Sequence, residues 1–123
     1  MTPVRVLLVE DNDTFRETLE LLFGLRDEIE VVASVATGDE APSVVRELRP
    51  DVVLMDYRMP GLNGAEATRL VLEADPTTRV VCLSASVTAE EVAEVQHAGA
   101  VAVVTKDEEF DRLVAIVCEA ARQ

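Results

Sequence analysis

Five short runs of valine, isoleucine and leucine recur along the chain, and they restrict its fold more than any other feature. The runs cover residues 4–9, 31–35, 52–55, 80–83 and 101–104. Apolar residues are nearly continuous in each run, a pattern typical of β-strands that are covered on both faces, as in a parallel sheet. The sequence therefore predicts a parallel sheet with helices packed on its two sides.

Segments with helical spacing separate and follow these runs. One apolar stripe follows a predicted cap at Asn12 or Asp13, and another lies near the carboxyl end. Three further helices are predicted over residues 39–48, 64–74 and 88–97, with glycine or proline at many of the boundaries. The two stripes are formed by Phe15, Leu19, Leu22 and Phe23 and by Leu113, Ile116, Val117 and Ala120.

The alternation of five strands with five helices predicts an open α/β sheet with right-handed crossovers. The usual order of five such strands is 2-1-3-4-5, with helices on both faces of the sheet. Ligands of these sheets bind beyond the carboxyl ends of the strands where the strand order reverses, here between the first and third strands. The length of 123 residues, with no internal linker or repeat, fits one domain over residues 1–123.

The charge balance excludes some partners and favours others. Eleven basic and 24 acidic residues give a formal net charge of -13, which repels nucleic-acid phosphates and anionic lipid head groups. We therefore expect no direct binding to nucleic acid or membrane, whereas a divalent cation or a basic partner surface suits this charge. The chain shows neither a signal peptide nor an apolar stretch of the roughly 18 residues that a membrane span requires. Cys82 and Cys118 lie in apolar stretches and are interpreted as reduced thiols of a cytoplasmic protein.

Polar side chains stand at the ends of four predicted strands. Glu10 and Asp11 follow the first, Asp56 the third and Ser84 the fourth, while Lys106, the only lysine, comes soon after the fifth. The predicted strand order brings three carboxylates together across the switch point, where their mutual repulsion favours a bound cation. Oxygen ligands with room for water and a phosphoryl oxygen suit Mg²⁺ better than Zn²⁺.

A carboxylate beside Mg²⁺, an ammonium group and a hydroxyl suits phosphoryl transfer. Asp56 could attack a phosphoryl group in line and hold it as an acyl phosphate. The metal and Lys106 would stabilise the charge, and backbone amides of residues 57–61 could add hydrogen-bond donors. The residues by themselves thus point to a phosphoacceptor site centred on Asp56.

Four segments together resemble the receiver domain of two-component response regulators in order and spacing: VRVLLVEDND, DVVLMDYRMPGLNG, VVCLSAS and AGAVAVVTKD. The likeness spans the whole chain and implies the flavodoxin-like fold of that family. It implies a signalling protein rather than a metabolic enzyme, which takes its phosphoryl group from a sensor histidine kinase. Lys106 followed by Asp107 is similar to receivers that precede a LuxR-type helix-turn-helix output domain. We expect no output domain within residues 1–123, and a stand-alone receiver and a receiver cut from a longer regulator stay open as alternatives.

The resemblance also implies roles for individual residues. Asp56 is matched to the phosphoacceptor, Ser84 to the switch hydroxyl and Lys106 to the salt-bridge partner of the phosphoryl group. The implied Mg²⁺ ligands are Glu10, Asp11, Asp56 and the backbone carbonyl of Arg58. Receivers usually carry tyrosine or phenylalanine three residues before the lysine, and this ring changes rotamer on activation. This chain has Val103 at that position, so the residues do not show how the chain would transmit its output signal. A homodimer and a separate output domain or effector protein are further partners that the resemblance allows.

Two other functions stay open at this point. A pseudo-receiver would share the fold as a binding module without phosphorylation; Val103 supports it, while the complete set of pocket residues argues against it. A haloacid dehalogenase-like phosphatase would use Asp11 as nucleophile, because Asp11-Asn12-Asp13-Thr14 fits the DxDxT loop of that family. Against the phosphatase, the chain is short and lacks a GDxxxD motif.

Overall fold

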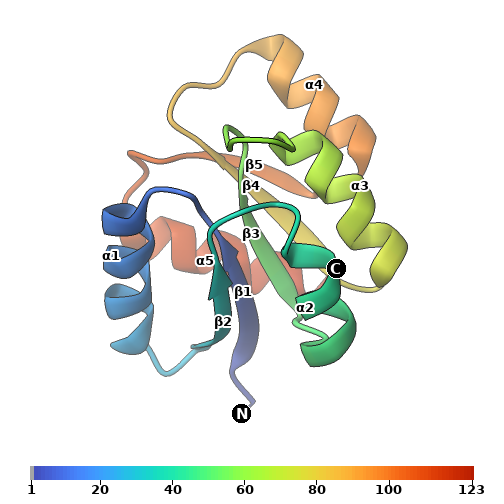
Figure 1. The fold of residues 1–123 in the computed structure, drawn as a ribbon. Helices are drawn as coiled ribbons and strands as arrows, with labels where there is room; N and C mark the ends of the chain where they lie inside the picture. Colours follow the sequence, from blue (N-terminus) through green and yellow to red (C-terminus); the bar gives the residue numbers. More distant parts are fainter. Residues whose placement is uncertain (1) are drawn as a thin grey trace.

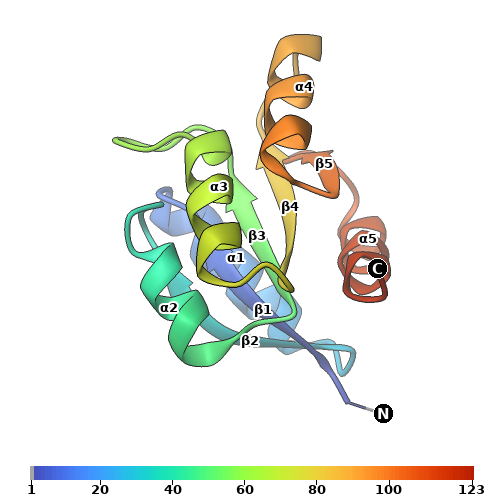
Figure 2. The same ribbon diagram turned by 90° about the vertical axis from the view of Figure 1, so that its right-hand side faces the viewer.

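The computed structural model describes residues 2–123 as a five-stranded sheet with helices on both faces (Figure 1 and Figure 2). The strand order is β2-β1-β3-β4-β5, and every neighbouring pair is parallel. Both features confirm the predicted topology. The strands are β1 (Val4–Val9), β2 (Ile29–Val35), β3 (Val52–Asp56), β4 (Arg79–Ser84) and β5 (Ala102–Thr105).

One helix follows each strand, as predicted. Asn12 is the cap of the first helix, since its side chain accepts a hydrogen bond from the backbone N–H of Phe15 at 2.9 Å. Asp13, the other predicted cap, is instead the first helical residue. The helices are α1 (Asp13–Gly24), α2 (Ala41–Leu48), α3 (Gly64–Ala74), α4 (Ala89–Ala98) and α5 (Phe110–Ala121). None of the helices formed by residues 2–123 is both long and apolar enough to cross a membrane.

Two hydrophobic clusters fill the space between the sheet and its helices. Successive side chains of a strand point to opposite faces, so β1 sends Leu7 and Val9 to one cluster and Val6 and Leu8 to the other. The first cluster includes buried residues of α2, α3 and α4, and the second includes those of α1 and α5. Figure 2 shows α3 and α5 on opposite sides of the sheet.

The β2 strand departs from the sequence prediction. It begins at Ile29, before the predicted run, and most of its side chains are only half-buried. Because β2 is an edge strand, it has a single neighbour, β1, and less cover than an interior strand. Every residue of the interior strand β3 is buried, as a strand covered on both faces requires.

Gly64 begins α3 against the backbone that follows Asp56. Its N–H donates to the carbonyl of Tyr57 at 2.7 Å. A β-carbon at this position would lie 2.7 Å from the Cα of Tyr57 and 2.9 Å from the carbonyl oxygen of Asp56. Both contacts are with backbone that the sheet holds in place, so the close approach of α3 to the end of β3 requires a glycine here.

We expect Gly64→Ala to lower the free energy of unfolding by ~2 kcal/mol, because the added methyl group forces the backbone apart. Gly24→Ala is the matched control, since a β-carbon at Gly24 has no atom within 4 Å. The control should keep or slightly gain stability, as alanine favours helix over glycine. Urea denaturation of the two variants beside the parent protein measures both effects, and equal stability of the variants would contradict the expected clash.

Candidate functional site

The polar residues predicted at strand ends do meet at one edge of the sheet. Asp56 and Ser84 are the last residues of β3 and β4, and Lys106 directly follows β5. Glu10 and Asp11 follow the end of β1. Since parallel strands end on the same side, the sheet itself positions these groups, and the site lies at the predicted switch point between β1 and β3.

Three carboxylates form the centre of this site. Glu10, Asp11 and Asp56 each offer an oxygen atom, and these atoms all lie within 4.8 Å of one another. Glu10 and Asp56 are only 2% and 3% exposed, whereas Asp11 is exposed. Burial strengthens the repulsion between the first two carboxylates, because little water remains to screen it. The exposed Asp11 leaves the cluster open to solvent on one side.

The ammonium group of Lys106 neutralises part of this charge. Its Nζ lies 2.8 Å from Oε1 of Glu10 and 3.3 Å from Oδ2 of Asp56. Burial lowers the pKa of Lys106, but the hydrogen bond to Glu10 and the charges of both carboxylates outweigh it and raise the pKa overall. Lys106 is therefore a permanent cation at the mouth of the site.

One cation does not balance the charge of three carboxylates, and the raised pKa of Asp56 reflects the negative charge that remains. Burial, together with a hydrogen bond to Glu10 and the charge of Glu10, raises the pKa of Asp56 from 3.8 to about 7, although Lys106 opposes the rise. Oε1 of Glu10 is in addition buried and lies 2.8 Å from the ammonium of Lys106, which Glu10 shares with Asp56. An all-oxygen cluster with surplus negative charge fits a hard divalent cation such as Mg²⁺.

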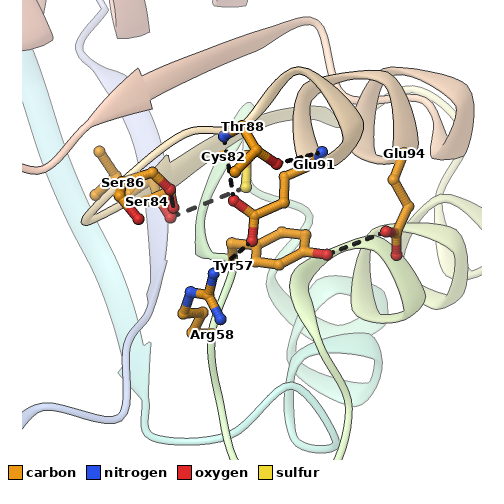
Figure 3. A network of polar contacts seen from close by, with 9 residues as sticks. Tyr57, Arg58, Cys82, Ser84, Ser86, Thr88, Glu91 and Glu94 are labelled. Atoms are coloured by element: carbon orange, nitrogen blue, oxygen red, sulfur yellow. Dashed lines mark hydrogen bonds and ion pairs between the residues drawn. The ribbon is translucent and has the colours of Figure 1, made fainter.

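Ser84 lies at the site with its hydroxyl turned away from the carboxylates. Its Oγ donates to the backbone carbonyl of Ser86 at 2.6 Å, within the loop that leads to α4 (Figure 3). The backbone carbonyl of Ser84 accepts from the N–H of Lys106 at 2.8 Å, which joins the ends of β4 and β5. A change of rotamer at Ser84 would release the Ser86 carbonyl.

The loop after Asp56 is tied to α4 by two side chains that the sequence analysis did not connect. Tyr57 donates its hydroxyl to Glu94 at 3.1 Å, and the guanidinium of Arg58 pairs with Glu91 at 2.8 Å (Figure 3). Glu91 also accepts from the N–H of Thr88 and so completes the cap of α4. The Thr88–Glu91 spacing is a visible capping signature, but no local pattern predicts its partner Arg58.

Two further residues complete the surroundings of the site. Val103 pairs with Cys82 across β4 and β5 and packs against the cluster under α2, α3 and α4. Phe15, assigned from its spacing to the apolar stripe of α1, also places its ring centroid 4.8 Å from Nζ of Lys106. The sequence gives no sign of this second contact, because it joins α1 to the residue after β5.

Residues 6–118 match the family model of the response regulator receiver domain. The chain belongs to this family. It is 37% identical over 114 residues to the transcriptional regulatory protein LnrK of Bacillus subtilis, which covers 93% of this chain and 52% of LnrK. The signal receiver domain of the putative response regulator NarL from Mycobacterium tuberculosis superposes with a TM-score of 0.93 at 31% identity, covering 99% of this chain and 98% of that structure. The resemblance predicted from the four segments is confirmed.

Receiver domains of this family also occur in relatives with other names. A protein-glutamate methylesterase/protein-glutamine glutaminase of Nitrosospira multiformis is 41% identical over 106 residues, which is 84% of this chain and 30% of that protein. The chain thus spans about half of LnrK and less of this methylesterase. What these proteins share with it is the receiver domain of two-component signalling, and phosphorylation and Mg²⁺ are typical of that family. The predicted phosphoacceptor signalling function is confirmed at this level, and none of these relatives favours a pseudo-receiver or a phosphatase.

Proposed function

We propose that Asp56 accepts a phosphoryl group from the phosphohistidine of a sensor kinase and holds it as an acyl phosphate. The observation that carries this proposal is the cluster of Glu10, Asp11 and Asp56 with the ammonium of Lys106 against it. In the transfer, a carboxylate oxygen of Asp56 bonds to phosphorus as the bond from phosphorus to the imidazole nitrogen breaks. Water later attacks the acyl phosphate, which releases inorganic phosphate and restores the carboxylate.

The residues that would hold Mg²⁺ are Glu10, Asp11, Asp56 and the backbone carbonyl of Arg58. The cluster geometry supports the three carboxylates as ligands, and the family resemblance supplies the carbonyl. Bound Mg²⁺ would offset the charge of the carboxylates and polarise the phosphoryl oxygens. The Arg58 guanidinium pairs with Glu91 and, as a cation without an acceptor atom, cannot bind a metal ion, so only the backbone carbonyl of Arg58 is proposed as a ligand.

Lys106 and Ser84 would then respond to the new phosphoryl oxygens. Lys106 already lies 3.3 Å from Asp56 and needs only to redirect its N–H groups toward the added charge. Ser84 would turn its hydroxyl from the Ser86 carbonyl to a phosphoryl oxygen, which frees the loop before α4. The signal would reach a partner as a shift between two populations of the α4 region. Val103 cannot serve as the aromatic switch, so α4 itself carries the change in this proposal.

The wider setting of this domain is also a proposal. We propose that residues 1–123 form one receiver domain that works in the cytoplasm and receives its phosphoryl group from a sensor histidine kinase. Its output would pass through a homodimer, an effector protein or an output domain of the LuxR-type helix-turn-helix class. The domain would assist its own phosphorylation and dephosphorylation, and it would act as a signalling protein rather than as a metabolic enzyme. The net charge of -13 disfavours direct contact with nucleic acid by this domain.

Intact mass spectrometry after incubation with acetyl phosphate tests the proposed function. We expect one phosphoryl adduct in the presence of Mg²⁺ and none in the presence of a chelator, and peptide fragmentation should locate the adduct on Asp56. A protein that binds Mg²⁺ but forms no adduct would be a pseudo-receiver. An adduct located on Asp11 would instead support the phosphatase.

A further inference from the structure

The ammonium of Lys106 has a third neighbour besides its two carboxylates. The ring of Phe15 lies with its centroid 4.8 Å from Nζ, a distance at which the negative face of an aromatic ring attracts a cation. Phe15 is half-buried and packs against the cluster under α1 and α5, so the apolar core helps to hold its ring in place. The ring therefore joins the core of the protein to the charged site.

A closed set of contacts fixes Phe15 relative to the site. The N–H of Asn12 donates to Oε2 of Glu10 at 3.0 Å, and the side chain of Asn12 accepts from the N–H of Phe15 at 2.9 Å. Lys106 closes the set through its contacts with Glu10 and with the Phe15 ring. Phe15 lies in the first turn of α1, where helical side chains lean toward the N-terminus, and its ring contacts Lys106 there.

We infer that Phe15 is a positioning residue for phosphoryl transfer, whose ring holds the ammonium of Lys106 at the mouth of the site. The inference rests on the proposed function of Asp56. A carboxylate in this place would compete for the N–H groups of Lys106, whereas a ring attracts the charge without accepting directed hydrogen bonds. The ammonium can then turn its N–H groups from Asp56 to a phosphoryl oxygen without losing its support.

The contact is measurable because Lys106 is the only lysine in the chain. Protein labelled with ¹³C-lysine gives a single ε-methylene signal, and a ring facing Nζ should shift the ε protons upfield and give a nuclear Overhauser effect to the Phe15 ring protons. We expect the upfield shift to disappear in Phe15→Leu and to persist in Phe15→Tyr. Phe110→Leu is the matched control, since Phe110 packs in the same cluster but faces Phe23 at a centroid distance of 5.1 Å.

The rate of phosphoryl uptake from acetyl phosphate tests the role. We expect Phe15→Leu to slow uptake about fivefold, the effect of a cation–π contact at a partly desolvated site. Phe15→Tyr should stay within about twofold of the parent because it retains the ring, and Phe110→Leu should do the same. This order separates positioning from a general loss of core packing, which both leucine variants would share.

Each outcome decides one part of the inference. An unshifted Lys106 signal in the parent, with no Overhauser effect from Phe15, overturns the contact even if Phe15→Leu is too unstable to assay. A shifted signal with unchanged uptake in Phe15→Leu overturns the positioning role. A parent protein that shows the shifted signal but forms no adduct contradicts the proposed function of Asp56, and with it the role of Phe15, while the contact itself stands.

Discussion

Asp56→Asn is expected to take up no phosphoryl group and, without Mg²⁺, to be more stable than the parent protein at neutral pH. The first result follows because the amide lacks the carboxylate oxygen that would bond to phosphorus. The second follows from the buried charge that the parent carries beside Glu10. Asparagine occupies nearly the same volume, bears no charge, and offers an N–H that can donate to Glu10. We expect a gain of ~2 kcal/mol in the free energy of unfolding at pH 7.5.

The gain should depend on pH in a defined direction. In the folded protein the pKa of Asp56 is raised from 3.8 to about 7, chiefly by burial and by Glu10. Between about pH 4 and pH 7 the folded state therefore holds a proton that the unfolded state has lost. The contribution of Asp56 to stability is present below this window and is lost as the pH rises through it. The two proteins should be similar in stability near pH 4 and diverge toward pH 7.5.

Chemical denaturation across this pH range, with a chelator present, measures the divergence. Added Mg²⁺ should reduce the difference in the free energy of unfolding between the two proteins, because a bound cation relieves in the parent the same repulsion that asparagine removes. A variant that is less stable than the parent at pH 7.5 would show that Asp56 is not an uncompensated charge. The stability measurement also serves as the folding control for the phosphoryl-uptake experiment. A folded and stabilised variant that takes up no phosphoryl group has lost the acceptor and not the fold.

The strand order and the main groups of the site were predictable because both depend on position along a strand. Continuous apolar runs indicated buried strands, and the residues that end these runs must share one edge of a parallel sheet. Glu10, Asp56 and Lys106 therefore come together from the pattern alone. The exceptions are the two edge strands, β2 and β5, where apolar runs predicted cover on both faces and an edge position leaves most of the side chains half-buried.

What the sequence could not predict depends on side-chain rotamers and on contacts between distant elements. The hydroxyl of Ser84 could turn to Asp56 or to its own loop, and only the structure shows the bond to Ser86. Tyr57 donates a hydrogen bond to Glu94, which lies 37 positions further along the chain, and no periodic pattern in the sequence predicts this pairing. Phe15 belongs to an apolar stripe and also contacts a cation, and a stripe predicts burial but not which charged group lies at its end.

Asp11→Asn is expected to weaken Mg²⁺ binding on the order of 100-fold, because it removes one of three clustered carboxylates and the one exposed to the solvent from which the ion enters. Asp13→Asn is the matched control. Asp13 lies two positions away, its side chain is 76% exposed, and it pairs with Arg16 at 2.8 Å outside the cluster. The control removes the same charge at the first residue of α1 without touching a proposed ligand, so its Mg²⁺ binding should match that of the parent.

Thermal or chemical unfolding over a series of Mg²⁺ concentrations gives the comparison. A ligand that binds the folded state stabilises it by ~1.4 kcal/mol for each tenfold rise in concentration above the dissociation constant. In Asp11→Asn this rise in stability should begin at about 100-fold higher Mg²⁺ than in the parent or in Asp13→Asn, and phosphoryl uptake should shift to higher Mg²⁺ in parallel.

The same pair of variants also tests the phosphatase alternative, because the DxDxT loop would need both aspartates. Equal losses of uptake in the two variants at saturating Mg²⁺, with Asp56→Asn still labelled, would favour that enzyme. Uptake that Asp13→Asn keeps, and that Asp11→Asn regains at higher Mg²⁺, supports a metal site that serves Asp56.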